Sequence, residues 1–351
     1  MKNNKESLFF IGTMSGTSLD GLDVCAVSFT KNSYTILYAE TVSYSPTIKK
    51  SLAHAHTLSG LELQQLHVDY GIFCGNCIAE FIQKYQLHID FIASHGHTVF
   101  HTPHTGLTFQ IGSGAHIAAI TGITTINDFR TLDVAFGGQG APLVPIGDEL
   151  LFSEYDYCLN IGGFANVSCT IENTRIAWDI CATNIVLNTF AETMNQEFDY
   201  NGELGKQGTI HTQLLADLES IAFYNQKPPK SLGREWVEQE IYPLLHTYNL
   251  SIHDIMRTFY EHIGIQIGKV LQGKNTKTLC TGGGVYNSFM IERIQQYSES
   301  SLIIPSSELI NFKEALIFAY LGFLRIQEKH NCLASVTGAR KNVCGGVIWK
   351  A

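Results

Sequence analysis

The sequence predicts a two-domain α/β protein, on three observations. The chain has 351 residues, which at roughly 150 residues per domain favours two domains. Apolar strand patterns alternate along the chain with apolar residues at helical spacing, as is typical of α/β folds. An apolar strand, a glycine-containing turn and two further strands occur near residue 8 and again near residue 155. We interpret this recurrence as a weak internal duplication, with a cleft between two similar halves.

The first half is predicted to contain the following elements in order: strand 8–11, loop 12–21, strand 22–29, strand 35–44, helix 60–86, strand 91–96, helix 114–122 and strand 123–128. The second half is predicted to contain three strands within 155–179, helical patterns, a strand within 276–294, a helix over 314–326, and a closing strand or turn within 331–350. The chain passes from one domain to the other near residues 130–145. We therefore expect a first domain of residues 1–130 plus about 325–351, and a second of 131–324.

Composition excludes several classes of protein. Hydrophobic residues make up 45% and charged residues only 16%, against roughly 25% charged residues in an average soluble protein, which argues against disorder. The net charge of −9 disfavours binding to nucleic acid and to anionic lipid. No stretch is long enough for a membrane span, and the first apolar run is too short for a signal peptide. Nine scattered cysteines fit a reducing compartment, so we expect a cytoplasmic protein.

Three glycine loops that follow predicted strands are candidates for binding phosphate. The first runs from Gly12 to Asp23, where small residues let backbone N–H groups approach phosphate oxygens, and where Asp20 or Asp23 can hold Mg²⁺. It is neither a Walker A loop nor a Rossmann fingerprint, and a plain polar hairpin is the alternative. The second loop carries Asn160, Gly162, Gly163 and Asn166. The third is Gly282-Gly283-Gly284, which ends a strand and opens a helix, as suits the diphosphate or adenosine of a nucleotide. Together the loops resemble those of actin-like, sugar-kinase-type ATPases.

Two clusters invite a metal interpretation, which we do not prefer. His95, His97, His101 and His104 lie close together in sequence, but without a nearby carboxylate or cysteine they favour a polar substrate loop over a metal site. Cys74 and Cys77 form a lone CxxC within a helical pattern, so buried small side chains are expected rather than a redox or zinc site.

Other polar residues have two interpretations each. Arg130, near Asp128 and Asp133, can clamp a substrate carboxylate or belong to a structural ion-pair set. Lys230 and Arg234 can bind an anion or lie in a solvated loop. Asp179 can act as a general base or cap the following helix, and Glu314 can be a functional acid or a favourable first-turn residue.

Taken together, the motifs resemble those of the anhydro-N-acetylmuramic acid kinase family. The resemblance covers almost the whole chain through GTMSGTSLDGLD, SHGHTVFHTP, TFQIG, DFRTLDVAFGGQGAPLVP, LNIGGFANVS, PPKSLGRE, CTGGGVYN, EALIFAYL and SVTGA. It implies a two-domain actin-like (ribonuclease H-like) fold with an active-site cleft between the domains. It also implies ATP-dependent phosphorylation of 1,6-anhydro-N-acetylmuramic acid with hydrolytic opening of the anhydro ring, which yields the 6-phosphate.

The resemblance also implies roles for residues. It places ATP phosphates on Gly16, Thr17, Ser18, Leu19, Asp20, Gly21, Leu22 and Asp23. Asp179 matches the general base. Glu314 and Arg130 match sugar-contacting positions, with Thr98 and His97 beside them. This chain departs from the family in having His97 where Gln is usual, and Ile180-Cys181-Ala182-Thr183 where the family has a run rich in glycine and proline.

We therefore expect a sugar kinase that uses ATP and Mg²⁺, with Asp20 as a candidate Mg²⁺ ligand and an amino sugar as the second substrate. No nucleic-acid or membrane partner is expected, and a homodimer is kept as the candidate assembly. A nucleotide-binding homologue that has lost the sugar reaction is the main alternative, supported by the departure at 180–183. A metal-dependent hydrolase is a third, supported only by the histidine cluster.

Overall fold

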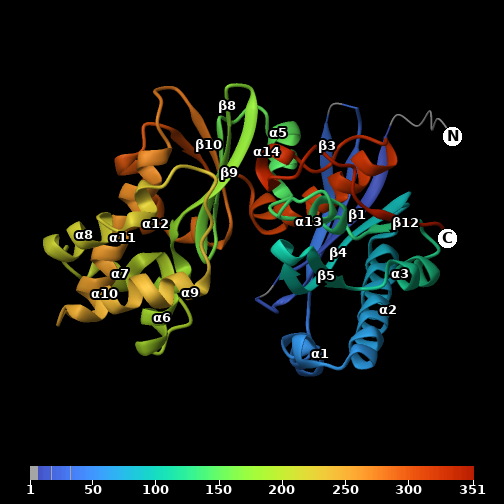
Figure 1. The fold of residues 1–351 in the computed structure, drawn as a ribbon, viewed down its shortest axis with the longest axis horizontal. Helices are drawn as coiled ribbons and strands as arrows, with labels where there is room; N and C mark the ends of the chain where they lie inside the picture. The colour runs from blue at the N-terminus through green and yellow to red at the C-terminus, as the bar shows by residue number, and fades with distance from the viewer. Residues whose placement is uncertain (1–6, 17, 32) are drawn as a thin grey trace. The chain divides into compact units, whose positions relative to one another are not determined.

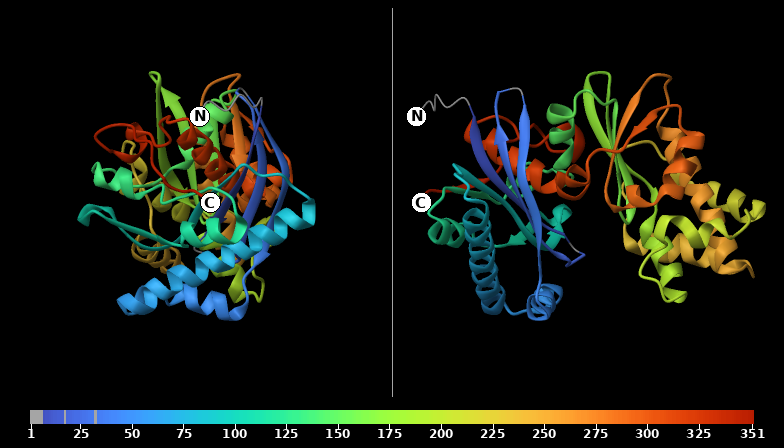
Figure 2. Two further views of the ribbon diagram at one scale, coloured as in Figure 1. Left: turned by 90° about the vertical axis from the view of Figure 1, so that its right-hand side faces the viewer. Right: turned by 180° about the vertical axis from the view of Figure 1, so that it is seen from behind.

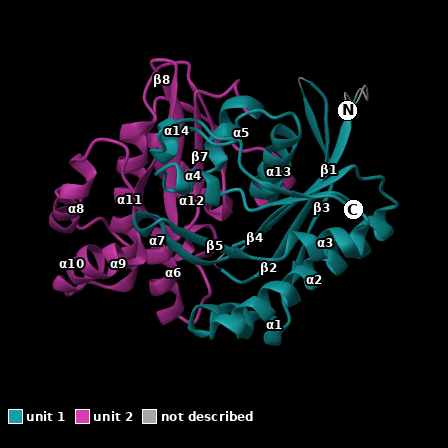
Figure 3. Ribbon diagram, turned by 45° about the vertical axis from the view of Figure 1, so that its right-hand side comes forward, with its two compact units in different colours: residues 1–151, 312–351 teal, residues 152–311 magenta. Residues whose placement is uncertain are grey.

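The computed structural model describes residues 7–16, 18–31 and 33–351, and divides the chain into two compact units. The first unit comprises residues 1–151 and 312–351, and the second comprises residues 152–311 (Figure 3). The first junction lies later in the chain than the expected one, and the second lies earlier.

The first unit is built on one mixed sheet with the strand order β12-β6-β4-β1-β2-β3, and β5 pairs with β4 (Figure 1). Strands β1, β2 and β3 are antiparallel neighbours, whereas β4 runs parallel to both β1 and β6. The strands are β1 (Leu8–Ser15), β2 (Gly21–Phe29), β3 (Tyr34–Ser43), β4 (Phe91–Thr102), β5 (Leu107–Ile111), β6 (Thr125–Asn127) and β12 (Val347–Trp349).

The helices of this unit are α1 (Pro46–Ala53), α2 (Gly60–Tyr85), α3 (Gly114–Thr121), α4 (Thr131–Ala135), α5 (Val144–Leu151), α14 (Ala334–Thr337) and most of α13 (Ser307–Ile326). Helix α2 begins with a capping box, in which the Ser59 side chain accepts from the Glu62 N–H and the Glu62 side chain accepts from the Ser59 N–H.

Helices cover both faces of the first sheet. Ile11 on β1 packs into a core shared with α2 and α3, whereas its neighbour Phe10 packs edge-to-face against Phe323 on α13. Gly12 also lies against α13, where a Cβ atom would come within 1.9 Å of the Ala315 carbonyl oxygen. Figure 2 shows these layers from two further sides. Because strand side chains alternate between faces, β1 is buried on both sides.

The second unit has a five-stranded sheet in the order β11-β10-β7-β8-β9. Its helices, α6 to α12, gather on one side of the sheet and form one core with it (Figure 1). The strands are β7 (Tyr157–Ile161), β8 (Phe164–Ile171), β9 (Thr174–Ala182), β10 (Lys277–Thr281) and β11 (Ser301–Ile303). The helices are α6 (Asn184–Thr193), α7 (Glu203–Lys206), α8 (Thr212–Glu219), α9 (Arg234–Trp236), α10 (Tyr242–Thr247), α11 (Ile252–Val270) and α12 (Ser288–Tyr297). The unit also contains the short 3-10 segments η4 (Ala222–Asn225) and η6 (Gly283–Tyr286).

The predicted α/β class and the internal duplication are confirmed by the sheets. In each unit three antiparallel strands are followed by two parallel ones beside the first, in the orders 3-2-1-4-6 and 9-8-7-10-11. Several boundaries were wrong: the helix predicted over 314–326 begins at Ser307, and the strands predicted within 155–179 continue to Ala182. The loop predicted from residue 12 begins only after Ser15, and the strand predicted over 91–96 continues to Thr102.

The cysteines and the longest helices were both predicted to belong to a water-exposed, reduced protein without membrane spans. Among the described residues the cysteines form no disulfide bond, and both Cys74 and Cys77 are buried in α2, as expected for small core side chains. Burial raises the pKa of Cys77 to about 11, which keeps its thiol protonated. Over the residues that the structure describes, no helix has the length and apolar character that a bilayer span needs.

Candidate active site

The first glycine loop connects β1 to β2 and is shorter than predicted. Ser18 and Asp20 are exposed in it, and Leu19 adopts a positive φ of 60°. Thr17 lies outside the described residues. Gly21 and Leu22 belong to β2, where Gly21 packs closely on β3 and the Leu22 side chain is buried in the core. The exposed loop and the backbone of its flanks are therefore the parts available to a phosphate.

Charged neighbours shift the pKa values of two carboxyl groups of the first unit, Asp23 and Glu314. Thr41 Oγ1 donates to Asp23 Oδ1 over 2.6 Å. Partial burial raises the pKa of Asp23, the hydrogen bond from Thr41 lowers it, and the charge of Asp20 raises it. Glu314 on α13 reaches solvent, yet desolvation by surrounding protein raises its pKa, which Arg130 lowers and Asp23 raises. The structure thus brings Glu314 into the electrostatic range of both Arg130 and Asp23 on β2.

Arg130 is oriented by neutral acceptors. Its Nε donates to His95 Nε2 over 3.0 Å, and its Nη1 donates to the Gly140 carbonyl over 2.6 Å. His95 Nδ1 is 2.9 Å from the Gly96 carbonyl oxygen, so this nitrogen carries the ring proton and Nε2 accepts. Burial and the charge of Arg130 hold the pKa of His95 well below its ordinary value, which keeps the ring neutral.

Asp133, predicted as a partner of Arg130, supports it indirectly. This fully buried carboxylate accepts from the Gly140 N–H over 2.7 Å, and from Thr337 Oγ1 and Cys332 Sγ in the C-terminal segment. Gly140 therefore links Asp133 to Arg130, and the C-terminal segment stabilises the loop that holds Arg130.

His97 ends a chain of buried hydroxyl groups. Tyr44 OH is 2.6 Å from Tyr70 OH and donates to Ser15 Oγ over 2.7 Å, and Ser15 Oγ is 2.9 Å from His97 Nδ1. Because Ser15 accepts from Tyr44, its own proton is available to Nδ1, which leaves the His97 proton on Nε2. Burial lowers the pKa of His97, in agreement with a neutral ring. Nε2 is therefore a hydrogen-bond donor, as the side-chain amide of Gln can be.

Thr98 and His101, which follow His97 on β4, contact side chains of the neighbouring strand β5. Gln110 Nε2 donates to Thr98 Oγ1 over 3.3 Å, and His101 Nδ1 is 3.1 Å from Thr108 Oγ1. Among the residues that the structure describes, no three His, Cys, Asp or Glu side chains are grouped to hold a metal ion.

In the second unit the two remaining glycine loops lie side by side. Strands β7 and β10 are parallel, and Thr281 pairs with Asn160 at their carboxyl ends. A Cβ atom on Gly282 would come within 2.6 Å of the Ile161 carbonyl oxygen and 2.7 Å of Asn160 Oδ1. Gly162 and Gly163 offer their carbonyl groups to the first turn of α6, since the Thr183 N–H donates to the Gly163 oxygen over 2.9 Å.

This packing predicts contrasting effects at neighbouring glycines. Gly282→Ala should destabilise the protein by about 1–3 kcal/mol, because φ is +86° and the methyl group would overlap the backbone of β7. Gly283→Ala, where a Cβ atom meets nothing within 4 Å, should change stability by no more than about 0.5 kcal/mol. Thermal unfolding without nucleotide measures both, and equal melting temperatures for the two variants would contradict the prediction.

Asp179 lies in a polar row across the second sheet. The strand register pairs Asn160 with Asn166, and Asn166 with Asp179, so the three side chains occupy neighbouring positions on β7, β8 and β9. The register of β8 and β9 shifts next to this row, between Ala165 and Asn166. Such irregularities commonly aim a side chain at a functional site.

The Asp179 carboxyl is half-buried and held on one oxygen. The Leu232 N–H donates to its Oδ2 over 2.8 Å, and the Asp179 N–H donates to the Lys230 carbonyl over 3.0 Å. Burial raises the pKa of this carboxyl, and the Leu232 N–H lowers it. The helix-cap interpretation of Asp179 is wrong, because Asp179 lies inside β9 and Thr183 occupies the N-cap position of α6.

Residues 180–183, where this chain differs from the glycine- and proline-rich run expected from the resemblance, do not form a loop. Ile180, Cys181 and Ala182 continue β9 and are buried, and Thr183 Oγ1 donates to the Gly162 carbonyl over 2.8 Å. None of these four residues has a positive φ, so side chains other than glycine fit there.

Lys230 and Arg234 have different surroundings. Lys230 is half-buried and turns toward backbone carbonyl groups, whereas the Arg234 side chain is 81% exposed and pairs with Glu238. The sequence interpretation missed the Leu232 N–H and the contact between His95 and Arg130. Both depend on segments distant in sequence, and a backbone donor leaves no signal in residue type.

Comparison with known families decides the relationship. The family described as "Anhydro-N-acetylmuramic acid kinase" matches residues 8–351. The chain belongs to this family.

Curated members of the anhydro-N-acetylmuramic acid kinase family match at full length. The member from Pasteurella multocida is 34% identical, with 98% of this chain and 97% of that protein covered. The member from Vibrio cholerae is 33% identical, with 98% and 99% covered. Among solved structures, the activator of 2-hydroxyisocaproyl-CoA dehydratase from Clostridium difficile with bound ADPNP has a TM-score of 0.43 and 14% identity over 92% of this chain and 97% of that one. The family assignment rests on the sequence matches.

Proposed function

We propose that this protein phosphorylates 1,6-anhydro-N-acetylmuramic acid with ATP and opens the anhydro ring with water. The observation that carries this proposal is the Asp179 carboxyl, which is half-buried in a polar row and held on Oδ2 by the Leu232 N–H. A carboxyl held in this way, in a member of this kinase family, suits a general base.

The proposed reaction joins hydrolysis of the anhydro bond to transfer of a phosphoryl group. The water oxygen bonds to the anomeric carbon while the bond from that carbon to O6 breaks, and one water proton passes to Asp179. O6 takes the γ-phosphoryl group, and ADP leaves with the electrons of the broken phosphate bond. The other water proton stays on the new anomeric hydroxyl group. The products are N-acetylmuramic acid 6-phosphate, ADP and the proton that Asp179 then releases to solvent.

The first unit supplies groups for the sugar. Arg130 uses Nε and Nη1 on protein acceptors, so we assign Nη2 to the carboxylate of the substrate. His97, with its proton on Nε2, would donate to a sugar oxygen, and Thr98 lies next to it. Glu314, whose raised pKa favours the protonated form more than usual, would accept or donate at a sugar hydroxyl group.

The glycine loops would hold ATP. The exposed loop of Gly16, Ser18 and Asp20 would bind phosphates through backbone N–H groups, and the paired loops of Asn160 and Gly282 would bind the nucleotide in the second unit. Asp20 is an exposed oxygen donor and fits Mg²⁺, which usually keeps one or two carboxylates, phosphate oxygens and water. When bound, Mg²⁺ would neutralise charge on the transferred phosphoryl group.

We also propose a cellular location and an assembly for this protein. Cysteines that form no disulfide bond, together with a negative net charge, fit the cytoplasm, and a homodimer remains the candidate assembly.

The direct test is a coupled assay of ADP release with and without 1,6-anhydro-N-acetylmuramic acid. Sugar-dependent ADP release, with the 6-phosphate identified by mass spectrometry, is the expected result. ATP binding without sugar-dependent turnover would favour the inactive homologue instead.

A further inference from the structure

The segment before α9 runs along the edge of the second sheet. The Asp179 N–H donates to the Lys230 carbonyl over 3.0 Å, and two residues later the Leu232 N–H donates to Asp179 Oδ2 over 2.8 Å. The backbone of residues 230–232 thus contacts Asp179 twice, once at its main chain and once at its carboxyl group. The position of this segment decides whether the Leu232 N–H reaches the carboxyl.

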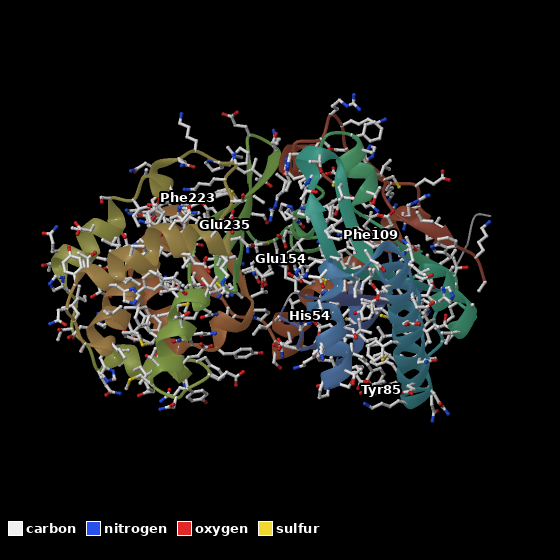
Figure 4. The ribbon with its side chains drawn as sticks, turned by 60° about the horizontal axis from the view of Figure 1, so that its bottom comes forward. His54, Tyr85, Phe109, Glu154, Phe223 and Glu235 are labelled. Atoms are coloured by element: carbon white, nitrogen blue, oxygen red, sulfur yellow. The ribbon has the colours of Figure 1, made fainter. Side chains whose placement is uncertain are left out.

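The side chain of Lys230 turns back into the protein. Its Nζ donates to the carbonyl oxygens of Phe223, over 3.0 Å, and Tyr224, over 3.5 Å, both in η4. It also lies 4.4 Å from the centroid of the Phe223 ring, a cation–π contact. Phe223 is labelled in Figure 4 together with Glu235, and the two lie on either side of the segment in sequence. An ammonium group engaged in this way is a poor candidate for holding a substrate anion.

The acceptors of Lys230 belong to a fixed part of the unit. Tyr224 OH is 2.9 Å from His262 Nε2 on α11, and His262 Nδ1 is 2.5 Å from Glu219 Oε1 at the end of α8. The rings of Phe223 and Tyr224 both pack against Trp236. His262 is fully buried, so η4 is tied to the helical core.

We propose that Lys230 is a positioning residue for Asp179 rather than a contact of the substrate. It ties residues 230–232 to η4, and so keeps the Leu232 N–H on Oδ2. Oδ1, which has no hydrogen-bond partner among the described residues, is then the oxygen that takes the proton from water. This inference rests on the proposed role of Asp179 as the general base.

The proposal predicts a change in pH dependence. The Leu232 N–H favours the charged carboxylate, so its loss should raise the pKa of Asp179 further and move the acid limb of kcat to higher pH. Among the described residues, the Cys181 thiol on β9 lies within electrostatic range of Asp179, and Glu219 and Lys230 lie within electrostatic range of Cys181. Burial keeps the Cys181 thiol protonated by raising its pKa, so it does not move with Asp179 over the pH range of the assay.

The test compares Lys230→Met with Lys227→Met, an equal loss of charge at an exposed position three residues earlier in the chain. For Lys230→Met we expect kcat to fall on the order of ten- to a hundredfold, because a base displaced by a fraction of an ångström loses orientation. Its acid limb should move up by about half a pH unit or more, while the KM for the sugar stays within about twofold. Lys227→Met should match the parent protein. Thermal unfolding establishes that both variants are folded.

The outcomes separate this inference from the proposed function. A rise in the KM for the sugar with unchanged kcat and acid limb would make Lys230 a substrate contact and overturn the inference, while the kinase activity stands. Lys230→Arg keeps the charge and the donors, so it should retain the acid limb of the parent protein, and a shifted limb in this variant would also overturn the inference. Lys230→Arg decides the matter if Lys230→Met does not fold. Absence of sugar-dependent turnover in the parent protein would instead contradict the proposed function itself.

Discussion

Asp179→Asn is expected to lower kcat by on the order of a hundred- to ten-thousandfold, because an amide cannot accept the proton of the attacking water. Asn keeps the size of Asp, and its oxygen can still accept from the Leu232 N–H, which now donates to Asp179 Oδ2 over 2.8 Å. The variant should therefore bind ATP and the sugar nearly as well as the parent protein. Turnover, ligand affinity and melting temperature are to be measured on one sample.

Glu172→Gln is the matched control, since Glu172 is an exposed acid in the turn between β8 and β9. It should keep the turnover of the parent protein. Retained activity in Asp179→Asn would remove Asp179 from the mechanism, and a large loss of melting temperature would point to a structural role instead.

The second large effect is expected at the loop between β1 and β2, the proposed site of the ATP phosphates. Asp20→Ala should reduce turnover with Mg²⁺ and ATP by on the order of a hundredfold or more, because the loss of a metal-binding carboxylate removes several kcal/mol of charge stabilisation. The fold should be unaffected, because Asp20 is exposed in the loop between β1 and β2 and is not part of the core. The dependence of the rate on Mg²⁺ concentration measures the effect.

Glu80→Ala, at an exposed position on α2, controls for the loss of one negative charge. Near-normal activity of Asp20→Ala over the whole Mg²⁺ range would show that this loop does not hold the metal and the phosphates.

Local patterns predicted the elements well, and long-range contacts explain where they failed. Alternation and helical spacing identified β2, β3 and α2, whose bounds lie within a residue of the predicted ranges. Gly12 was assigned to a loop because glycine is common in turns, but α13 packs on it from far along the chain. The sequence carries no sign of that contact.

The candidate site shows the same division. The sequence selected Asp179 and Arg130, since their residue types and positions after predicted strands suit chemistry. The contacts that orient them come from Leu232 and His95, and these depend on how distant segments pack. Lys230 was selected for its charge, and the structure turns that charge toward the backbone of η4.

The contact between Gly12 and α13 also couples two parts of the first unit. Gly12 lies on β1, which leads into the loop before β2, and its missing side chain leaves room for the carbonyl oxygen of Ala315, the residue after Glu314. The separation between the loop and Glu314 is thus set by the thickness of two backbones in direct contact. A single methyl group at position 12 would overlap the Ala315 carbonyl oxygen, and would push the two backbones apart without any change to the residues of the loop or to Glu314 itself.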